Sequence, residues 1–125
     1  MTIGEMAIQT NLPESTLRYY EKKELLKVER DGNGRRVYAE SDIEWVQFIC
    51  RLKETGMSLK DIQHYSKLRY RGTTTMPERL EMLQLHREYV LEQQTKWAEY
   101  LQNLDNKIDF YQASIDNDNS LNLTP

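Results

Sequence analysis

The stretch Thr16-Leu17-Arg18-Tyr19-Tyr20-Glu21 decides how the rest of the chain is interpreted. It follows Pro13, a residue that favours the first position of a helix, so a helix is predicted over about 13–21. The planar guanidinium of Arg18 can bind a guanine edge or a phosphate through two hydrogen bonds. The neighbouring tyrosine hydroxyls can donate to phosphate oxygens. These are the side chains of a DNA recognition helix, but an ordinary surface helix can carry them too. The rest of the chain must decide between these two interpretations.

The composition indicates one small domain, or a small domain with an appendage. The 125 residues are 38% hydrophobic and 30% charged, and Cys50 is the single cysteine, which excludes an internal disulfide. No segment approaches the ~18 apolar residues that span a membrane. The N-terminus lacks the basic and apolar regions of a signal peptide. We therefore expect a cytoplasmic protein with no membrane partner.

The net charge of −3 hides an uneven distribution. Residues 1–72 contain 13 Lys and Arg against 11 Asp and Glu, a balance of +2, whereas residues 73–125 contain 4 against 9, a balance of −5. Seven of the basic side chains fall between positions 15 and 36, against four acidic ones. A local basic face is enough for phosphate contact even in an acidic chain.

A short helix and a hairpin are predicted on either side of the opening stretch. Thr2-x-x-Glu5 has the form of a capping box and begins a helix that ends before Pro13. This helix and the next make a helix-turn-helix, an arrangement that unrelated helical hairpins share. The turn Asp31-Gly32-Asn33-Gly34 carries two hairpin signals, because Asp-Gly and Asn-Gly tolerate positive φ. We interpret the hairpin as a wing with Arg35 and Arg36 near its tip.

Three further helices follow the hairpin. Ser41-x-x-Glu44 begins one over about 42–54, and Ser58-x-x-Asp61 begins another over about 59–69. Lys60 lies in the first turn of the latter, where free backbone N–H groups favour anions, so it is a candidate phosphate contact as well as an ordinary surface lysine. The last helix is predicted over about 76–115, a rod of roughly 60 Å.

The last helix carries the repeat of a coiled coil. Between Leu80 and Ile115, nine of eleven positions at alternating spacings of three and four are apolar or aromatic. A single small domain has no surface that would cover such a helix, so the pattern predicts a homodimer. The predicted dimer contacts are Leu83, Val90, Trp97, Leu101, Leu104, Ile108 and Tyr111.

The predicted fold class is mainly α. A winged helix-turn-helix DNA-binding domain occupies 1–72, a coiled-coil dimerisation helix occupies 73–115, and a disordered tail occupies 116–125.

The order of these elements and their short sequence motifs resemble those of the MerR family of bacterial transcription regulators. The resemblance implies an antiparallel coiled-coil dimer that binds a pseudo-palindrome in double-stranded promoter DNA. It also implies that the dimer twists and bends the promoter so that RNA polymerase can engage both promoter elements. The matching pieces are Thr2-Ile3-Gly4-Glu5, Thr16 to Glu21, Leu25-Leu26, Gly34-x-Arg36-x-Tyr38, Asp42-Ile43 and Gly56-x-Ser58-Leu59.

The resemblance also implies individual DNA contacts. Arg18 and Tyr19 are expected in the major groove, and the wing and Lys60 are expected on the backbone. Tyr20 is included for its hydroxyl, although its spacing from Leu17 points inward. The full predicted set is Ser15, Thr16, Arg18, Tyr19, Tyr20, Arg35, Arg36, Tyr38 and Lys60.

Two positions depart from the family pattern. Pro13 stands where many relatives have a Ser or Thr cap, which leaves the start of the recognition helix open by one residue. Glu24 stands where relatives usually have Gly. If that site requires a left-handed backbone, Glu24 lowers the free energy of unfolding by roughly 1 kcal/mol relative to Gly.

The sequence leaves two interpretations of Cys50. A closer resemblance, to the aldehyde-responsive AdhR-like branch, implies electrophile sensing through a single cysteine in the third helix, although that branch has its cysteine one position later, where Arg51 stands here. Alternatively, Ile43, Val46 and Cys50 fall at core spacing, and a free cysteine is often simply buried. Nearby, Trp45 and Phe48 are expected either to line an effector pocket or to widen an interface with the long helix.

No metal site, cofactor or enzymatic activity is predicted. Cys50, His64 and His86 are too few and too scattered for a tetrahedral metal site. We expect a sequence-specific transcription regulator that distorts promoter DNA to activate transcription, with electrophile sensing through Cys50 as one option. The alternative is a DNA-associated architectural or adaptor coiled-coil protein without effector sensing.

Overall fold

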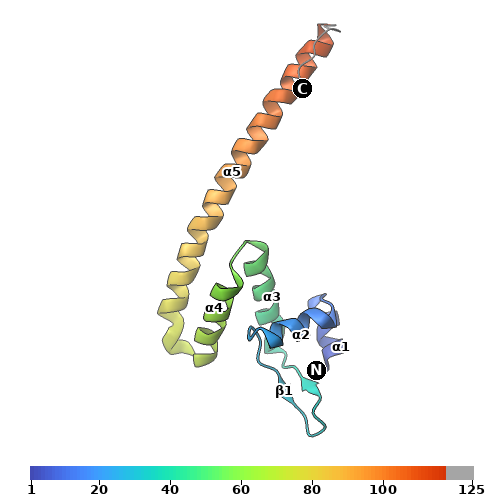
Figure 1. Cartoon of the computed structure of the whole chain (residues 1–125), viewed down its shortest axis with the longest axis vertical. Coiled ribbons are helices and arrows are strands. Elements are labelled where there is room, and N and C mark those ends of the chain that lie inside the picture. Colours follow the sequence, from blue (N-terminus) through green and yellow to red (C-terminus); the bar gives the residue numbers. More distant parts are fainter. Residues whose placement is uncertain (118–125) are drawn as a thin grey trace. The chain divides into compact units, whose positions relative to one another are not determined.

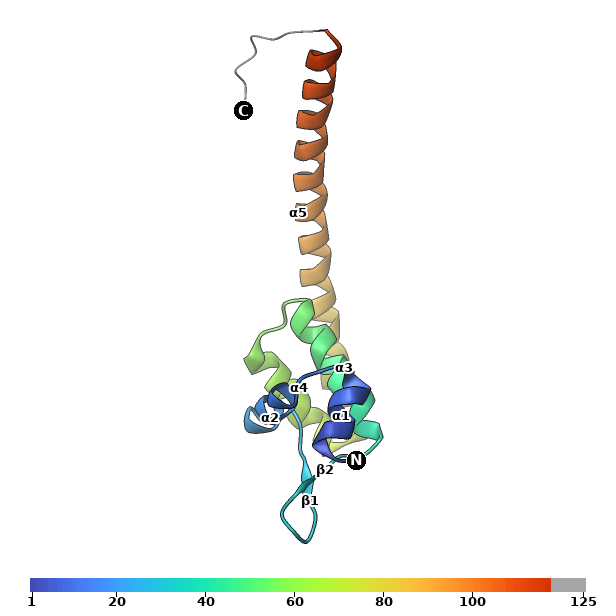
Figure 2. The ribbon, with the colours of Figure 1, turned by 90° about the vertical axis from the view of Figure 1, so that its right-hand side faces the viewer.

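The computed structural model describes residues 1–117 and is mainly helical, as predicted (Figures 1 and 2). A two-stranded antiparallel sheet pairs Glu29 with Val37 and Arg30 with Arg36. The chain divides into two units, Met1–His86 and a second that begins at Arg87. In order, the elements are α1 (Ile3–Thr10), α2 (Glu14–Lys22), β1 (Glu29–Arg30), β2 (Arg36–Val37), α3 (Ser41–Glu54), α4 (Leu59–Arg71), the 3₁₀ turn η1 (Thr73–Thr75) and α5 (Met76–Asp116).

The two helices of the predicted helix-turn-helix are confirmed. The Thr2 hydroxyl caps α1 by accepting from the Glu5 amide at 3.1 Å. Asn11 ends α1 in the left-handed region, with φ of 55°. Pro13 is the N-cap of α2 and not its first helical residue, because its ψ of 148° is extended, so the recognition helix begins one residue later than predicted.

One predicted helix cap is wrong and another is confirmed. α3 begins at Ser41 itself, after Glu40, and Asp42 Oδ2 accepts a hydrogen bond from the Ala39 amide at 2.9 Å in place of a serine cap. Ser58 does cap α4, since its hydroxyl accepts from the Asp61 amide at 3.1 Å.

Gly56 and Glu24, like Asn11, are residues with positive φ that follow helices in the first unit. Gly56 (φ 88°) follows α3, where the amide of Met57 donates to the carbonyl of Leu52 at 2.9 Å in the pattern of a Schellman motif. Glu24 (φ 61°) follows α2 in the same region of φ, without the conformational freedom of glycine. The sequence analysis expected strain at Glu24 if its backbone were left-handed, and the observed φ meets that condition.

A single core joins the two helices, the wing and the α3–α4 pair. Leu25 and Leu26 are fully buried in it, and they lie among the buried faces of all the helices of the first unit before α5. The carbonyl of Leu25 accepts hydrogen bonds from Trp45 Nε1 and from Ser66 Oγ, both at 2.9 Å. α3 and α4 lie side by side (Figures 1 and 2).

The start of α5 packs with the first unit, which extends to His86, whereas the predicted DNA-binding domain ends at residue 72. Thr75 is buried, and its hydroxyl donates to the carbonyl of Leu68 at 2.6 Å. Farther along, Met82 and Leu83 pack against the core, and the Thr55 hydroxyl lies 2.7 Å from His86 Nε2. These contacts hold the first turns of α5 on α3 and α4.

The second unit continues α5 with no buried residue. Asp116 is the last helical residue and Asn117 is in a turn, so the rest of the tail predicted over 116–125 lies outside the described residues. Within the described chain, no helix combines the length and apolarity needed to cross a membrane.

Replacing Glu24 with glycine should raise the free energy of unfolding by about 1 kcal/mol, because glycine adopts positive φ without a Cβ penalty. Glu24→Ala is the matched control, since it removes the exposed carboxylate and keeps the strain. Urea unfolding at one fixed protein concentration measures both variants. If both variants change the free energy of unfolding equally, backbone strain at this site is not the cause of the change.

Candidate nucleic-acid interface

The recognition helix α2 divides into a buried and an exposed face. Leu17 and Tyr20 are buried in the core. Ser15, Arg18 and Tyr19 are exposed, and their spacing places them on one side of the helix. The structure thus brings together three of the residues predicted to contact DNA, while Thr16, at the edge of this face, is half-buried.

Arg18 has only a weak protein partner. Its Nη2 donates to Glu14 Oε2 at 3.3 Å, and the two side chains are 48% and 45% exposed. An exposed pair of this kind contributes about 0–1 kcal/mol. Arg18 can therefore exchange Glu14 for a base edge or a phosphate at little cost.

Tyr20, predicted to contact DNA, faces the core. Its side chain is 3% exposed, and its hydroxyl lies 3.5 Å from Cys50 Sγ on α3. Burial, reinforced by the contact with Cys50, raises the pKa of the Tyr20 hydroxyl well above its usual value. The i, i+3 spacing from Leu17 already indicated this inward orientation.

Tyr38, also predicted to contact DNA, is buried in the core. The side chain is 1% exposed, and burial raises the pKa of its hydroxyl. Its backbone anchors the N-terminus, since the Met1 amino group donates to the Tyr38 carbonyl at 2.6 Å and the Tyr38 amide donates back to Met1 at 2.8 Å. Tyr38 is therefore a core residue that holds the base of the wing.

The wing is tied to the recognition helix through Glu21. Its two carboxylate oxygens accept from Arg30 Nη2 at 2.6 Å and from Arg36 Nε at 2.9 Å. Sequence reasoning gave Glu21 and Arg30 no role, because their pairing depends on how the hairpin folds back. Arg36 is thus half-buried in an ion pair that orients the wing, and its contact with the DNA backbone stays a prediction.

The tip of the wing is shaped by Asp31. Its Oδ1 accepts from the amides of Asn33 at 2.8 Å and Arg35 at 2.9 Å, and Gly34 takes a φ of 77°. These contacts leave the Arg35 side chain exposed at the tip, where the sequence placed it.

The N-terminal half of α4 contacts the end of the recognition helix. Gln63 Nε2 donates to the carbonyl of Lys23 at 2.8 Å, and Lys60 is exposed three residues earlier.

Lys53 of α3 is a candidate for DNA contact that the sequence did not indicate. Its ammonium lies 5.4 Å from the centre of the Tyr19 ring and 5.1 Å from that of Tyr20. Only its position in the last turn of α3 could have signalled this, and many surface lysines share that feature.

Cys50 lies at the margin of the core and not at its centre. It is half-buried, and its sulfur contacts the Tyr20 hydroxyl behind the recognition helix. The thiol therefore contacts the buried side of α2, through the side chain of Tyr20. Among residues 1–117, no group of three or more His, Cys, Asp or Glu could hold a metal ion.

Comparison with known proteins identifies the family. The model of the MerR HTH family regulatory protein matches residues 1–68, and that described as MerR, DNA binding matches residues 43–113. An HTH-type transcriptional regulator of Haemophilus influenzae is 36% identical over 114 residues, which cover 90% of this chain and 84% of that protein. AdhR of Bacillus subtilis is 36% identical over 93 residues, covering 74% of this chain and 66% of AdhR.

Solved structures agree with these matches. HiNmlR, described as a MerR family regulator lacking the sensor domain and bound to promoter DNA, has a TM-score of 0.79 and 35% identity, with 90% of each chain covered. A MerR family transcriptional regulator from Listeria monocytogenes has a TM-score of 0.86 and 28% identity, with 92% of this chain and 88% of that chain covered. The chain therefore belongs to the MerR family of helix-turn-helix transcription regulators.

Proposed function

We propose that this DNA-binding regulator acts as a homodimer that grips two half-sites of a pseudo-palindromic promoter and distorts the DNA between them for RNA polymerase. The observation that carries the proposal is the exposed face of α2, where Ser15, Arg18 and Tyr19 face solvent beside a wing locked in place by Glu21. One such face can read only half of a palindrome, so two copies are required.

Cations surround this face and supply the phosphate contacts. Lys22 is exposed on α2, and Lys23 Nζ lies 5.9 Å from the centre of the Tyr19 ring. Lys53, Lys60 and Arg35 add exposed charges from α3, α4 and the wing. Contacts of this kind position a protein on DNA without reading sequence, whereas Arg18 can read a base edge.

α5 provides the surface that binds the second copy of the chain. Trp97, Leu104 and Ile108 are 70%, 62% and 61% exposed in the single chain, and Leu101 and Tyr111 are exposed at the same spacing. Such a row of apolar side chains is stable in water when a second helix covers it. Leu83 differs from the other predicted dimer contacts because it already packs against the core of the first unit, and Val90 is half-buried.

A rigid DNA-binding unit suits distortion better than a flexible one. The ion pairs of Glu21 fix the wing relative to α2, and the hydrogen bond from Gln63 fixes α4. Smoothly bending a site of 20–30 base pairs costs of order 1–6 kcal/mol, which stiff protein contacts can offset. The similarity to HiNmlR, whose structure is described as bound to promoter DNA, supports a promoter as the binding partner.

Transcription in vitro from the chain's own promoter tests the proposal. Purified polymerase should start at that promoter more often when the protein is present. We propose that the distortion compensates for a spacer between the promoter elements that is too long, so shortening this spacer should remove the dependence on the protein. Specific binding without any change in transcription would favour the architectural or adaptor alternative.

Arg18→Ala should weaken specific operator binding by about 1–3 kcal/mol, because the bidentate contact to a base is lost. Lys96→Ala, which removes one cation from the second unit, is the control and should bind normally. Fluorescence anisotropy at fixed salt measures both. Unchanged affinity of Arg18→Ala would exclude a base-reading role for this side chain.

Leu101→Asp combined with Leu104→Asp should yield monomers in sedimentation, since two carboxylates would be buried in the coiled-coil seam. Asn103→Asp with Asn106→Asp adds the same charge to the same stretch off the seam and should remain dimeric. If the first pair of substitutions also sediments as a dimer, the interface lies elsewhere.

For effector sensing, we propose that electrophiles such as aldehydes act through Cys50, whose sulfur touches the recognition helix at Tyr20. Cys50→Ser should then retain operator binding and lose aldehyde-induced transcription, because the hydroxyl fills a similar volume but is a poor nucleophile. Normal induction of this variant would assign Cys50 to the core.

A further inference from the structure

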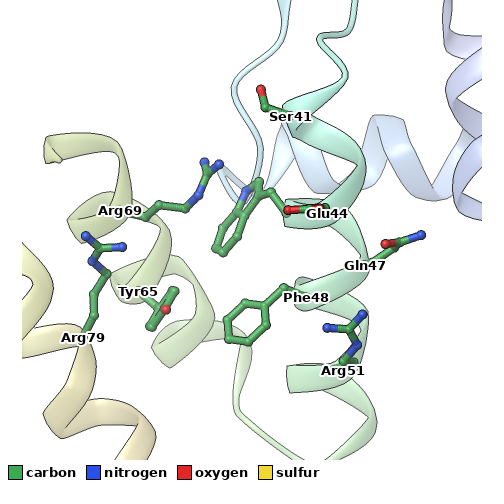
Figure 3. Close-up of a pocket in the computed structure, with 9 residues that line it drawn as sticks. Ser41, Glu44, Gln47, Phe48, Arg51, Tyr65, Arg69 and Arg79 are labelled. Carbon is green, nitrogen blue, oxygen red and sulfur yellow. The ribbon is translucent and has the colours of Figure 1, made fainter. Parts of the chain in front are cut away.

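A groove that the DNA-binding role does not use lies between α3, α4 and the start of α5. It has a volume of about 640 Å³ and lies wholly within the first unit. Figure 3 shows Arg69 and Arg79 on one side of it and Phe48 and Arg51 on the other. A volume of this size is typical of sites for small organic ligands.

The groove faces away from the recognition helix. α3 directs Cys50 and Lys53 toward Tyr20, whereas Glu44, Phe48 and Arg51 line the groove. These two sets lie on different faces of one helix, because residues three and four apart share a face. The groove is therefore separate from the DNA-contact face.

The floor of the groove is aromatic. Trp45 and Tyr65 stack with ring centres 5.9 Å apart and planes 15° apart, and Phe48 lies 5.6 Å from Tyr65. Phe48 is half-buried, so its ring remains accessible to a ligand. Such a floor favours a flat aromatic group, which can stack or meet the rings edge to face.

The rim is cationic and poorly neutralised. Three arginines line it against one carboxylate, Glu44, a balance of +2. Within the part of the chain that the structure describes, Arg51, Arg69 and Arg79 form no ion pair, and the arginines that do are Arg18, Arg30 and Arg36. An arginine that lines a cavity without a carboxylate partner retains donors for an anion.

Two of these arginines are held in place before any ligand binds. Arg79 donates from Nε to the Thr75 hydroxyl at 3.1 Å and from Nη2 to the Gly72 carbonyl at 3.2 Å, which leaves three of its five N–H groups. The Arg69 guanidinium lies 4.5 Å from the centre of the Trp45 ring and 5.1 Å from that of Tyr70. Stacking of this kind fixes a guanidinium while its edge stays free for a carboxylate.

We propose that this groove binds a planar aromatic carboxylate, with the ring against Phe48 and Tyr65 and the carboxylate between Arg69 and Arg79. The aromatic floor and the unneutralised rim select for both halves of such a molecule. A neutral aromatic of the same shape satisfies only the floor.

Isothermal titration of the full chain with 2-naphthoate, in the absence of DNA, tests the proposal. We expect saturable binding of one molecule per chain, and at least tenfold weaker binding of 2-naphthamide. Arg69→Gln should weaken the binding of 2-naphthoate at least tenfold, as should Arg79→Gln. Arg71→Gln, on the same helix as Arg69 but outside the groove, should leave it unchanged.

Two further readouts separate this site from folding and from DNA binding. Circular dichroism establishes that each variant is folded, and Phe48→Leu, which keeps the charges, should also weaken 2-naphthoate binding. Operator affinity of Arg69→Gln should equal that of the unmodified chain. Equal binding of naphthoate and naphthamide, full binding by folded Arg69→Gln, or no saturable binding by the unmodified chain, as when a second copy fills the groove, would each overturn the proposal.

Discussion

The carbonyl oxygen of Leu25 is the point on which the DNA-binding unit depends. It accepts hydrogen bonds from Trp45 on α3 and from Ser66 on α4, and both bonds are buried. In such a dry environment each bond is strong and each unmade partner is costly. The carbonyl lies three residues after the end of the recognition helix at Lys22, so these two bonds hold α3 and α4 against the segment that leaves that helix. With that side of α2 covered, its opposite face is the one presented to solvent.

Glu21 has the corresponding role on the side of the wing. It ends the stretch that begins at Thr16, and its carboxylate holds Arg30 and Arg36 of the two strands. The same six residues therefore provide an exposed cation, two core side chains and the anchor of the wing. This combination explains how one short helix can orient a DNA-binding surface, and it underlies our proposal that two such rigid surfaces strain the DNA between them.

Local patterns in the sequence predicted the helices, the hairpin and the inward face of α2, because capping residues, turn residues and helical spacing act over a few positions. Contacts between distant residues could not be predicted in this way. Tyr38 follows a strand of two residues, too short to show which face is buried. The pairing of Glu21 with the wing and the approach of Lys53 to Tyr19 require the folded chain. The groove beneath Arg69 and Arg79 likewise forms only when α3, α4 and the start of α5 pack together.

The central claim, that the exposed face of α2 reads a specific promoter, is tested most directly by equilibrium binding across a series of salt concentrations. DNA from the chain's own promoter region would be compared with a scrambled duplex of the same length. The account predicts a preference of roughly 10³-fold or more for the promoter, together with an affinity that falls steeply as salt rises. Equal affinity for the two duplexes, or an affinity independent of salt, would contradict it.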